Sequence, residues 1–221
     1  MKLELKNLTL QYTGKPPLFE NLHLTLESGD FALVQGPSGS GKSSFLRLLN
    51  RLQEPTVGEI QIDGKPITQH DVIHFRRRIG YVQQTPIMVV GTVRDNLTLP
   101  FQFKIAHGQK IPADEDLQQK LNAYLLSDIG LDDPADELSV GQKQRIALIR
   151  SLFVQPELLL CDEPTSALDD QSREIVEAEL ERANQDMGAG VILVPHLDVQ
   201  PQKVNPRKFI LDSNSLQEVT W

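Results

Sequence analysis

Three short apolar runs most constrain the fold of this chain. They cover residues 31–35, 158–161 and 191–194, and polar or turn-forming residues flank each run. A strand that is apolar along its whole length, without alternation, is typical of a parallel sheet covered by helices on both faces. We therefore predict three central strands of an α/β fold.

Between these runs, apolar residues recur at helical spacing, and near the N-terminus they alternate with polar ones. Alternation at Leu22, Leu24 and Leu26, and nearly so over residues 3–10, predicts half-buried strands. The helical faces are expected to include Phe45, Leu48, Leu49 and Leu52; Leu117, Leu121, Tyr124 and Leu125; Ile146, Ile149 and Phe153; and, less regularly, Ile175, Glu179, Leu180 and Ala183.

The composition excludes several protein classes. The chain has 221 residues with 22 Lys plus Arg against 30 Asp plus Glu, a net charge of −8 that disfavours nucleic-acid binding. The longest unbroken stretch of apolar residues is four, since residues 31–35 end in Gln35, whereas a membrane span needs about 20. We expect a soluble, cytoplasmic chain without a secretory signal. With a single cysteine, Cys161, it forms no internal disulfide, and the arginine run at 76–78 is expected to be a solvated helix end.

Residues 36–43, Gly-Pro-Ser-Gly-Ser-Gly-Lys-Ser, match the phosphate-loop pattern G-x-x-x-x-G-K-[ST] between a predicted strand and a predicted helix. The glycines allow consecutive backbone N–H groups to face phosphate oxygens, and the following helix adds its positive N-terminus. Lys42 is expected to bind the β- and γ-phosphates, and Ser43 to bind Mg²⁺. We predict a nucleoside triphosphate site made by Gly36, Pro37, Ser38, Gly39, Ser40, Gly41, Lys42, Ser43 and Ser44.

Two carboxylates, Asp162 and Glu163, end the second apolar run. Ligands of open α/β sheets bind beyond the carboxyl ends of the strands, so this pair should face the phosphate loop. Asp162 is expected to hold Mg²⁺, through water, and Glu163 to polarise the water that attacks the γ-phosphate. Cys161, one residue earlier, is interpreted as a small buried packing residue.

Residues 138–145, Leu-Ser-Val-Gly-Gln-Lys-Gln-Arg, begin another predicted helix. Ser139 and Gln142 have the S-x-x-Q spacing of a capping box, which on its own predicts an ordinary helix start. A serine hydroxyl, the Gly141 backbone and free helix N–H groups also form an anion site. The chain thus carries a second candidate phosphate-binding element.

At these residues the chain resembles the nucleotide-binding subunits of ABC transporters, from Leu3 to about Asp212. Besides the phosphate loop and the acidic strand end, residues 138–145 resemble the family signature. Further matches, in family order, are Tyr12 to the aromatic that stacks on adenine, Gln84 to the glutamine that senses Mg²⁺ and the γ-phosphate, residues 166–169 to the D-loop, and His196 to the switch histidine.

The resemblance implies one ABC ATPase domain over residues 1–221. Its α/β P-loop NTPase (RecA-like) core would carry an N-terminal antiparallel β subdomain and an inserted helical subdomain. The expected core with the β subdomain covers residues 1–90 and 154–221, and the helical subdomain with the signature covers 91–153, entered through an irregular segment at 91–112. Because the chain ends at Trp221, we expect no added regulatory domain.

The resemblance also implies ATP and Mg²⁺ as cofactors, with Lys42, Gln84, Glu163 and His196 in catalysis and Ser43, Gln84 and Asp162 at the metal. It implies a homodimer in the ATP-bound state, in which Ser139, Gly141 and Gln142 contact the nucleotide of the other subunit. Membrane permease subunits would be the partners, at the cytoplasmic face of the cell membrane, with no nucleic acid bound.

The chain departs from the family pattern at a few positions. Val140 stands where the signature usually has a glycine and is expected to slow dimer closure, and Ser44 replaces a common threonine. Pro195 removes a backbone donor before His196. Gln83 adjoins Gln84, so spacing alone selects Gln84.

Short segments from Gln84 onward indicate a type of transporter, and two rival functions are also considered. The chain resembles the ATP-binding subunits assigned to metal (iron) export at residues 84–86, 91–93, 95–97 and 100–101. After these, the subunits of phosphate importers are among the most similar in appearance. One rival is an ABC-type ATPase acting on nucleic acid or ribosomes, although such proteins usually carry two cassettes or a coiled-coil insertion. The other is a small-molecule kinase, in which residues 138–145 and His196 would have no role.

Overall fold

Two β-sheets share the chain, and the helix that follows the phosphate loop packs between them. The structure is a computed structural model and describes residues 1–103, 106, 109–212 and 215–219. The first sheet is antiparallel, with the order β2 (Pro17–Glu27), β1 (Lys2–Gln11), β4 (Val57–Ile62) and β5 (Lys65–Pro66). Its alternating burial along β1 and β2 confirms the half-buried strands predicted near the N-terminus.

The second sheet forms the centre of the molecule. Its order is β10 (Leu216–Val219), β9 (Arg207–Leu211), β3 (Phe31–Gln35), β8 (Gly190–Val194), β7 (Leu158–Asp162) and β6 (Ile79–Val82). All neighbours are parallel except β10, which is antiparallel to β9. Every residue of β7 and β8 is buried, as expected for strands covered on both faces, so the predicted α/β fold is confirmed.

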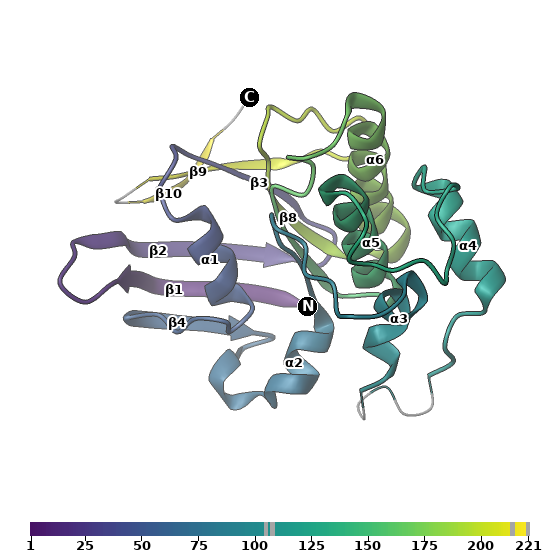
Figure 1. The fold of residues 1–221 in the computed structure, drawn as a ribbon. Helices are drawn as coiled ribbons and strands as arrows, with labels where there is room; N and C mark the ends of the chain where they lie inside the picture. Colours follow the sequence, from purple (N-terminus) through teal and green to yellow (C-terminus); the bar gives the residue numbers. More distant parts are fainter. Residues whose placement is uncertain (104–105, 107–108, 213–214, 220–221) are drawn as a thin grey trace.

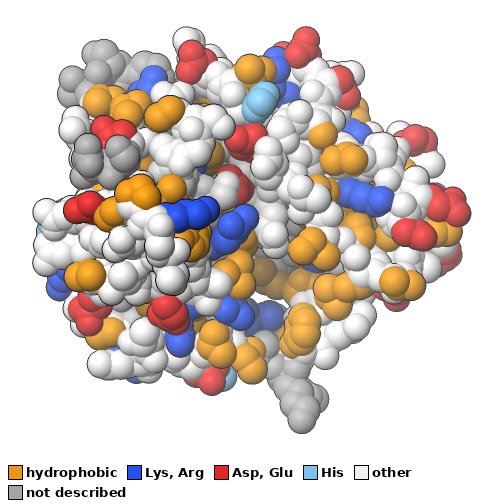
Figure 2. Space-filling model, turned by 60° about the vertical axis from the view of Figure 1, so that its left-hand side comes forward, with side chains coloured by type: hydrophobic (Ala, Val, Ile, Leu, Met, Phe, Trp, Pro, Cys, Tyr) orange, Lys and Arg blue, Asp and Glu red, His pale blue; other side chains and the backbone are white. Residues whose placement is uncertain are grey.

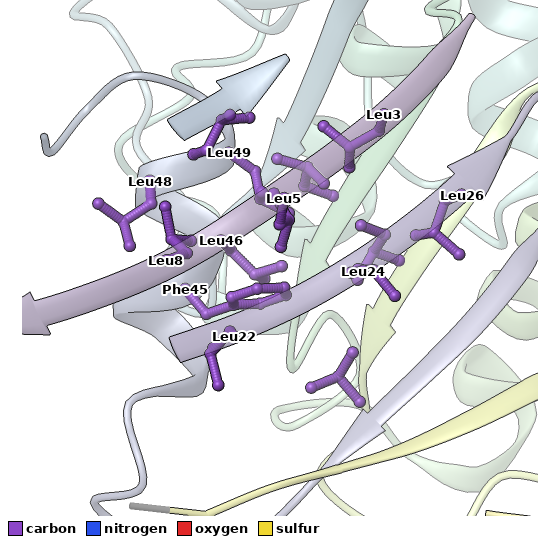
Figure 3. Packing of buried hydrophobic residues seen from close by; sticks show 14 of the residues in the cluster. Leu3, Leu5, Leu8, Leu22, Leu24, Leu26, Phe45, Leu46, Leu48 and Leu49 are labelled. Carbon is purple, nitrogen blue, oxygen red and sulfur yellow. The ribbon is translucent and has the colours of Figure 1, made fainter. Parts of the chain in front are cut away.

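One apolar core lies between the first sheet and α1 (Lys42–Leu49). Figure 3 shows leucines of β1 and β2 pointing toward Phe45, Leu46, Leu48 and Leu49 of α1. Phe19 meets Phe45 edge to face, with ring centroids 6.4 Å apart. Each fully buried leucine or phenylalanine contributes roughly 1.5–3 kcal/mol relative to an exposed one. This core fixes α1, and with it the phosphate loop at the start of α1.

A second core covers the other face of the central sheet (Figure 1). It is formed with α3 (Val93–Thr98), α4 (Asp114–Ala123), α5 (Val140–Phe153) and α6 (Asp170–Met187). The predicted apolar faces at Leu117 and Leu121, at Ile146 and Ile149, and at Leu180 and Ala183 are all buried. The remaining helical elements are α2 (Val72–Arg78) and the 3₁₀ turns η1 (Ile67–Gln69) and η2 (Leu99–Phe101).

Two predicted helical faces extend beyond the observed helices. Leu52 lies after the end of α1 and is exposed, because Asn50 caps the helix and Arg51 has a φ of 51°. Likewise α4 ends at Ala123, and Leu125 turns away with a φ of 54°. Both turns use the left-handed region, which cannot continue a helix. Apolar spacing alone therefore overestimated these two helices.

The segment at 91–112 and the arginine run also differ from expectation. Thr92 and Asp95 form a capping box that begins α3, so part of the segment predicted to be irregular is helical. The arginines do end α2, but they are not simply solvated. Arg76 donates to the carbonyls of residues 50 and 51, and Arg78 pairs with Asp63 and Glu157. Trp221 lies outside the described residues.

Candidate functional site

A cavity of about 960 Å³ opens at the carboxyl edge of the central sheet. The space-filling view is hollowed near its centre, with charged side chains of both signs around the hollow (Figure 2). The cavity is lined by Tyr12, Leu18, Gln35, Gly36, Ser38, Gly39, Gly41, Lys42, Ser43, Ser44, Gln84, Glu163, Pro195, His196, Leu197 and Asp198. Most of the residues predicted from separate motifs therefore meet in one place.

Parallel pairing explains this convergence. The strands β6, β7 and β8 are consecutive neighbours, and β3 pairs with β8 on its other side. Gln84, Glu163 and His196 each follow the end of one of these strands by one or two residues, and the phosphate loop follows β3. Because parallel strands end at the same edge, the segments that follow them share one crevice.

The phosphate loop turns sharply into α1. Gly41, immediately before the helix, has a φ of 96°, and a Cβ there would lie 2.7 Å from Leu18 Cδ2. Only glycine accepts this combination. Lys42 Nζ donates to the backbone oxygens of Gly36 at 2.9 Å and Pro37 at 3.0 Å. The ammonium group is thus held over the loop, where a phosphate would exchange for these carbonyls.

Two residues of the predicted loop do not line the cavity. Pro37 contributes its backbone oxygen to Lys42. Ser40 is buried, and its Oγ finds no hydrogen-bond partner among the residues that the structure describes. The Ser40 N–H donates to the Pro37 carbonyl at 3.2 Å, so these two residues hold the turn of the loop, while its other predicted residues line the cavity.

Tyr12 lies at the outer side of the cavity, on the loop after β1. Its hydroxyl and Ser44 Oγ are 3.2 Å apart, and 42% of the side chain is exposed. The hydrogen bond with Ser44 lowers the pKa of the Tyr12 hydroxyl from its ordinary value. The ring is thereby anchored beside the start of α1 while part of the side chain stays exposed at the cavity.

Glu163 occupies the centre of the acidic strand end. Its Oε2 accepts from Gln84 Nε2 at 2.8 Å and lies 3.2 Å from His196 Nδ1. The backbone N–H of Glu163 bonds to the Val194 carbonyl at 2.9 Å, and its φ is 45°, a conformation that is uncommon outside glycine. Backbone strain of this kind accumulates at functional sites. Three strand ends therefore meet on one carboxylate oxygen.

Asp162 is buried just behind Glu163. Burial raises the pKa of its carboxyl, against the opposing hydrogen bond with Ser43. Its Oδ1 accepts no hydrogen bond from the described residues. A buried carboxylate oxygen without a partner, beside a serine hydroxyl, fits a hard cation. In the described part of the chain, no cluster of three or more His, Cys, Asp or Glu could hold a metal alone, so a cation here would need further oxygen ligands, from phosphate or water.

Several cavity residues were missed by sequence reasoning. Gln35 Nε2 donates to Asp198 Oδ1 at 3.0 Å, which ties the end of β3 to the segment after His196. Leu18 and Leu197 supply apolar surface. Gln35 precedes the phosphate loop and Asp198 follows His196 by two residues. Proximity to the motifs was the available signal, although it does not indicate which neighbours face inward.

The signature segment is not part of this cavity. Ser139 caps α5 by accepting from the Gln142 N–H at 3.3 Å, and Gln142 returns a hydrogen bond to the Ser139 N–H, which confirms the capping box. Gly141 lies against the D-loop, where a Cβ would be 2.9 Å from the Ala167 carbonyl oxygen. The predicted contacts of Ser139, Gly141 and Gln142 with a nucleotide are therefore not made within this cavity.

Comparison with known proteins identifies the family. The family model for ABC transporters matches residues 19–166, which is more than half of the chain. The chain belongs to the ABC transporter family. Residues 19–166 include the phosphate loop, Gln84, the signature segment and the acidic strand end.

Individual relatives agree with this family assignment. ABC transporter I family member 17 of Arabidopsis thaliana is 39% identical, over 92% of this chain and 76% of the relative. The choline transport ATP-binding protein OpuBA of Bacillus subtilis is 33% identical, over 98% of this chain and 57% of the relative. This chain thus spans only part of each relative's length.

A solved structure extends the agreement to the fold. An ATP-binding cassette in a dimeric, post-hydrolysis state bound to ADP and Pi has a TM-score of 0.82 and 29% identity, over 98% of this chain and 97% of the other. Both the α/β P-loop fold and the hydrolytic activity are therefore established for this ABC cassette, which converts ATP and water to ADP and phosphate. No helix in the described ranges is long and apolar enough to cross a bilayer.

Proposed function

We propose that this cassette is the ATP-hydrolysing subunit of a transporter and works as a homodimer on membrane permease subunits at the cytoplasmic face of the cell membrane. One observation carries the proposal. Glu163, held by Gln84 and His196, faces the phosphate loop across the cavity, while Ser139, Gly141 and Gln142 lie outside it. The site within one subunit thus contains the proposed base, Glu163, and the proposed sensors, Gln84 and His196, but not the signature segment at 138–145.

The residues have distinct roles in this proposal. Lys42 exchanges its bonds with the Gly36 and Pro37 carbonyls for phosphate oxygens, and Tyr12 supports the base of the nucleotide. Glu163 accepts a proton from the attacking water, because its Oε2 is already aimed into the cavity by Gln84 and His196. Mg²⁺, held by Ser43, Asp162 and Gln84, would neutralise phosphate charge. Positioning and charge carry most of the barrier reduction in phosphoryl transfer.

The signature segment supports dimerisation. Its capped helix start, with Ser139 and the small Gly141, has the character of an anion site but is absent from the cavity of its own subunit. A second copy in head-to-tail orientation would place it on the nucleotide. The dimeric state of the ADP-bound cassette of similar fold supports the same arrangement.

The segment at 86–103 supports a membrane partner. Ile87 and Val90, shortly after Gln84 in the chain, are 60% and 101% exposed, and Phe103, further along, is 57% exposed. Exposed large apolar side chains near a nucleotide sensor in the chain favour a docking surface. We propose that residues 91–153 form a helical subdomain, and that the permease contacts Phe103 of this subdomain together with Ile87 and Val90 in the segment that leads into it.

We extend the proposal to a small solute or metal ion as the transported substrate, with iron export as the specific candidate. The segments at 84–86, 91–93, 95–97 and 100–101 support metal export by resemblance, and the relative named for choline transport supports a small solute. Deleting this chain together with its permease should raise cellular iron if the pair exports it. If cellular iron stays unchanged while cellular phosphate or choline changes, iron is not the transported substrate, and the solute whose level changes becomes the candidate.

The substitution Glu163→Gln tests the proposed mechanism. It removes the base but preserves size and one hydrogen-bonding oxygen, so turnover should fall by about a hundredfold or more while ATP affinity stays within about twofold. The variant should accumulate as an ATP-bound dimer in light scattering. Glu157→Gln, a carboxylate change at the opposite end of β7, is the matched control and should keep normal turnover. Near-normal turnover of Glu163→Gln would exclude Glu163 as the base.

Coupling to a membrane protein needs its own test. Cysteines introduced at Ile87 and Val90, in a Cys161→Ser background, should cross-link to a co-expressed permease. The rival function, an ABC-type ATPase acting on nucleic acid or ribosomes, disagrees with the net charge of −8. ATPase activity that rises with ribosomes or RNA but not with permease would favour that rival.

A further inference from the structure

A buried amide, Gln144, connects three functional segments that lie far apart in the sequence. It lies one turn into α5, and only 1% of its surface is exposed. Its Nε2 donates to the Gln84 backbone oxygen at 3.1 Å and to Ser166 Oγ at 3.2 Å. Its Oε1 accepts from the Ala167 N–H at 3.3 Å. Both ends of the amide are therefore used.

The orientation of this amide is determined by its partners. The Gln84 carbonyl can only accept a hydrogen bond, and the Ala167 N–H can only donate one. A flipped amide would place oxygen against oxygen and nitrogen against N–H, which costs free energy in a buried site. Gln144 therefore holds the two segments in one fixed relation.

The same helix face holds the turn at 166–167 a second time. Gly141 precedes Gln144 by three residues, so both residues lie on one face of α5. A Cβ at Gly141 would be 2.9 Å from the Ala167 carbonyl oxygen. The start of α5 is thus fitted to this turn by close approach at Gly141 and by hydrogen bonding at Gln144.

Gln84 extends the connection to the catalytic carboxylate. Its backbone is held by Gln144, and its side chain donates to Glu163 Oε2 at 2.8 Å. A displacement of α5 would move the Gln84 backbone and, through it, the hydrogen bond on Glu163. The path runs from α5 through the buried Gln144 to the Gln84 backbone, and the exposed Gln84 side chain completes it at Glu163.

We infer that Gln144 is a positioning residue that sets the placement of Gln84 against Glu163 according to the position of α5. The inference rests on the proposed function, in which the start of α5 binds the nucleotide of the other subunit. When the start of α5 binds the nucleotide of one site of the dimer, the resulting shift would be transmitted within that subunit to Glu163, the catalytic base of the other site. Gln144 itself touches no nucleotide in this scheme, because it does not line the cavity.

A double-mutant cycle on the full chain tests the inference, with ATP as the probe. Gln144→Leu removes all three hydrogen bonds and should lower kcat by about tenfold or more, while ATP affinity stays within about twofold. If Gln144 acts through Gln84, adding Gln144→Leu to Gln84→Ala should cost less than about twofold further. The inference is wrong if the losses of kcat from the two single substitutions multiply in the double mutant. It is also wrong if a folded Gln144→Leu protein keeps normal kcat.

The variant Gln144→Glu gives a readout that a packing role would not change. A protonated Glu can still donate to the Gln84 carbonyl, whereas an ionised one repels it. The ratio of its kcat to that of the native chain should therefore rise as pH falls, while the ratio for Gln144→Leu stays flat. Equal, flat ratios for both variants would contradict positioning by this hydrogen bond.

Asn184 provides the matched control. It is a second buried amide, and it donates to the carbonyls of Gly29 at 2.8 Å and Ala189 at 2.9 Å, away from the cavity. Asn184→Leu should lower thermal stability without changing kcat at a permissive temperature. If Gln84→Ala alone keeps normal kcat, the sensing role of Gln84 in the proposed function fails. If Gln84→Ala lowers kcat but the effects of Gln84→Ala and Gln144→Leu multiply in the double mutant, the positioning role of Gln144 is wrong while the proposed function stands.

Discussion

Gln84 Nε2 lies 2.8 Å from Glu163 Oε2, although 79 residues separate the two in the chain. The same oxygen lies 3.2 Å from His196 Nδ1. Two side chains that can donate hydrogen bonds thus aim one carboxylate into the cavity before any nucleotide is present. In the proposed mechanism, this preorganisation lowers the reorganisation needed when Glu163 polarises the attacking water.

Lys42→Ala should weaken ATP binding. The ammonium group is the only full positive charge of the phosphate loop, and loss of a charge-assisted hydrogen bond costs about 1.5–3 kcal/mol, or roughly ten- to a hundredfold in affinity. Isothermal titration with ATP measures this directly. Lys6→Ala, which removes a lysine that bonds only to Gln61 on the first sheet in the described contacts, should bind ATP normally. Equal affinity of both variants would remove Lys42 from the phosphate site.

Gly141→Ala should impair turnover more than ATP binding. The added Cβ would meet the backbone oxygen of Ala167 at 2.9 Å, and backbone cannot move aside as a flexible side chain can. Overpacking of this kind costs about 1–3 kcal/mol of stability. A melting curve, an ATP titration and a turnover assay together separate the effects. Unchanged stability and kcat would mean that the turn at 166–167 adapts freely.

Val140→Gly should speed dimer closure. Val140 is 55% exposed at the first turn of α5, on the surface proposed to approach the other subunit's nucleotide. Its removal should raise kcat by about two- to tenfold, while glycine in place of valine costs at most about 1 kcal/mol of helix stability. Val140→Ala is the graded control and should be intermediate. A lower kcat in both variants would instead assign Val140 a favourable contact.

Glu157→Gln should lower stability in a pH-dependent way. Arg78 Nε donates to Glu157 Oε1 at 2.6 Å and Nη2 to Oε2 at 2.9 Å, and this pairing lowers the pKa of Glu157. A lowered carboxyl pKa stabilises the fold above the unfolded pKa, and the contribution disappears as pH falls through the folded pKa. For this partly exposed pair we expect a loss of about 0.5–1 kcal/mol at pH 7.

Urea unfolding of both proteins at pH 7, 5 and 3.5 checks this prediction. The difference between Glu157→Gln and the native chain should shrink toward the lowest pH, where the native Glu157 also becomes protonated. High salt should shrink it as well, since the pair is partly exposed to solvent. A difference that stays constant with pH would attribute the effect to packing.

Local patterns predicted the local structure well where a few neighbouring residues decide the geometry. The phosphate loop, the capping box at Ser139 and the buried runs of β7 and β8 all appear as expected. The ends of helices did not follow from apolar spacing, as Leu52 and Leu125 illustrate, because left-handed turns at Arg51 and Leu125 interrupt the period. The partners of Arg76 and Arg78 come from distant segments and had no local signal.

Gln144 and Gln35 show a further limit of sequence reasoning. Each lies within or beside a recognised motif, but its contacts reach residues 60 and 163 positions away in the sequence. A glutamine on an amphipathic helix is ordinarily a surface residue, and nothing in the pattern around Gln144 indicates that it is buried. Only the packing of α5 against the segments that follow β6 and β7 places it in the interior.

The sequence by itself determined where a phosphate-loop pattern, a capped helix start and an acidic strand end lie, because backbone turns, helix caps and side-chain chemistry depend on few neighbouring residues. The binding and catalytic roles of these residues stay predictions. The tertiary structure decided that Gln84, Glu163 and His196 share one oxygen, and that the signature lies outside the cavity. The physical reason is strand order. Parallel pairing of β6, β7 and β8 brings their ends to one edge, and long-range pairing is selected by burial of the whole sheet rather than by any single motif.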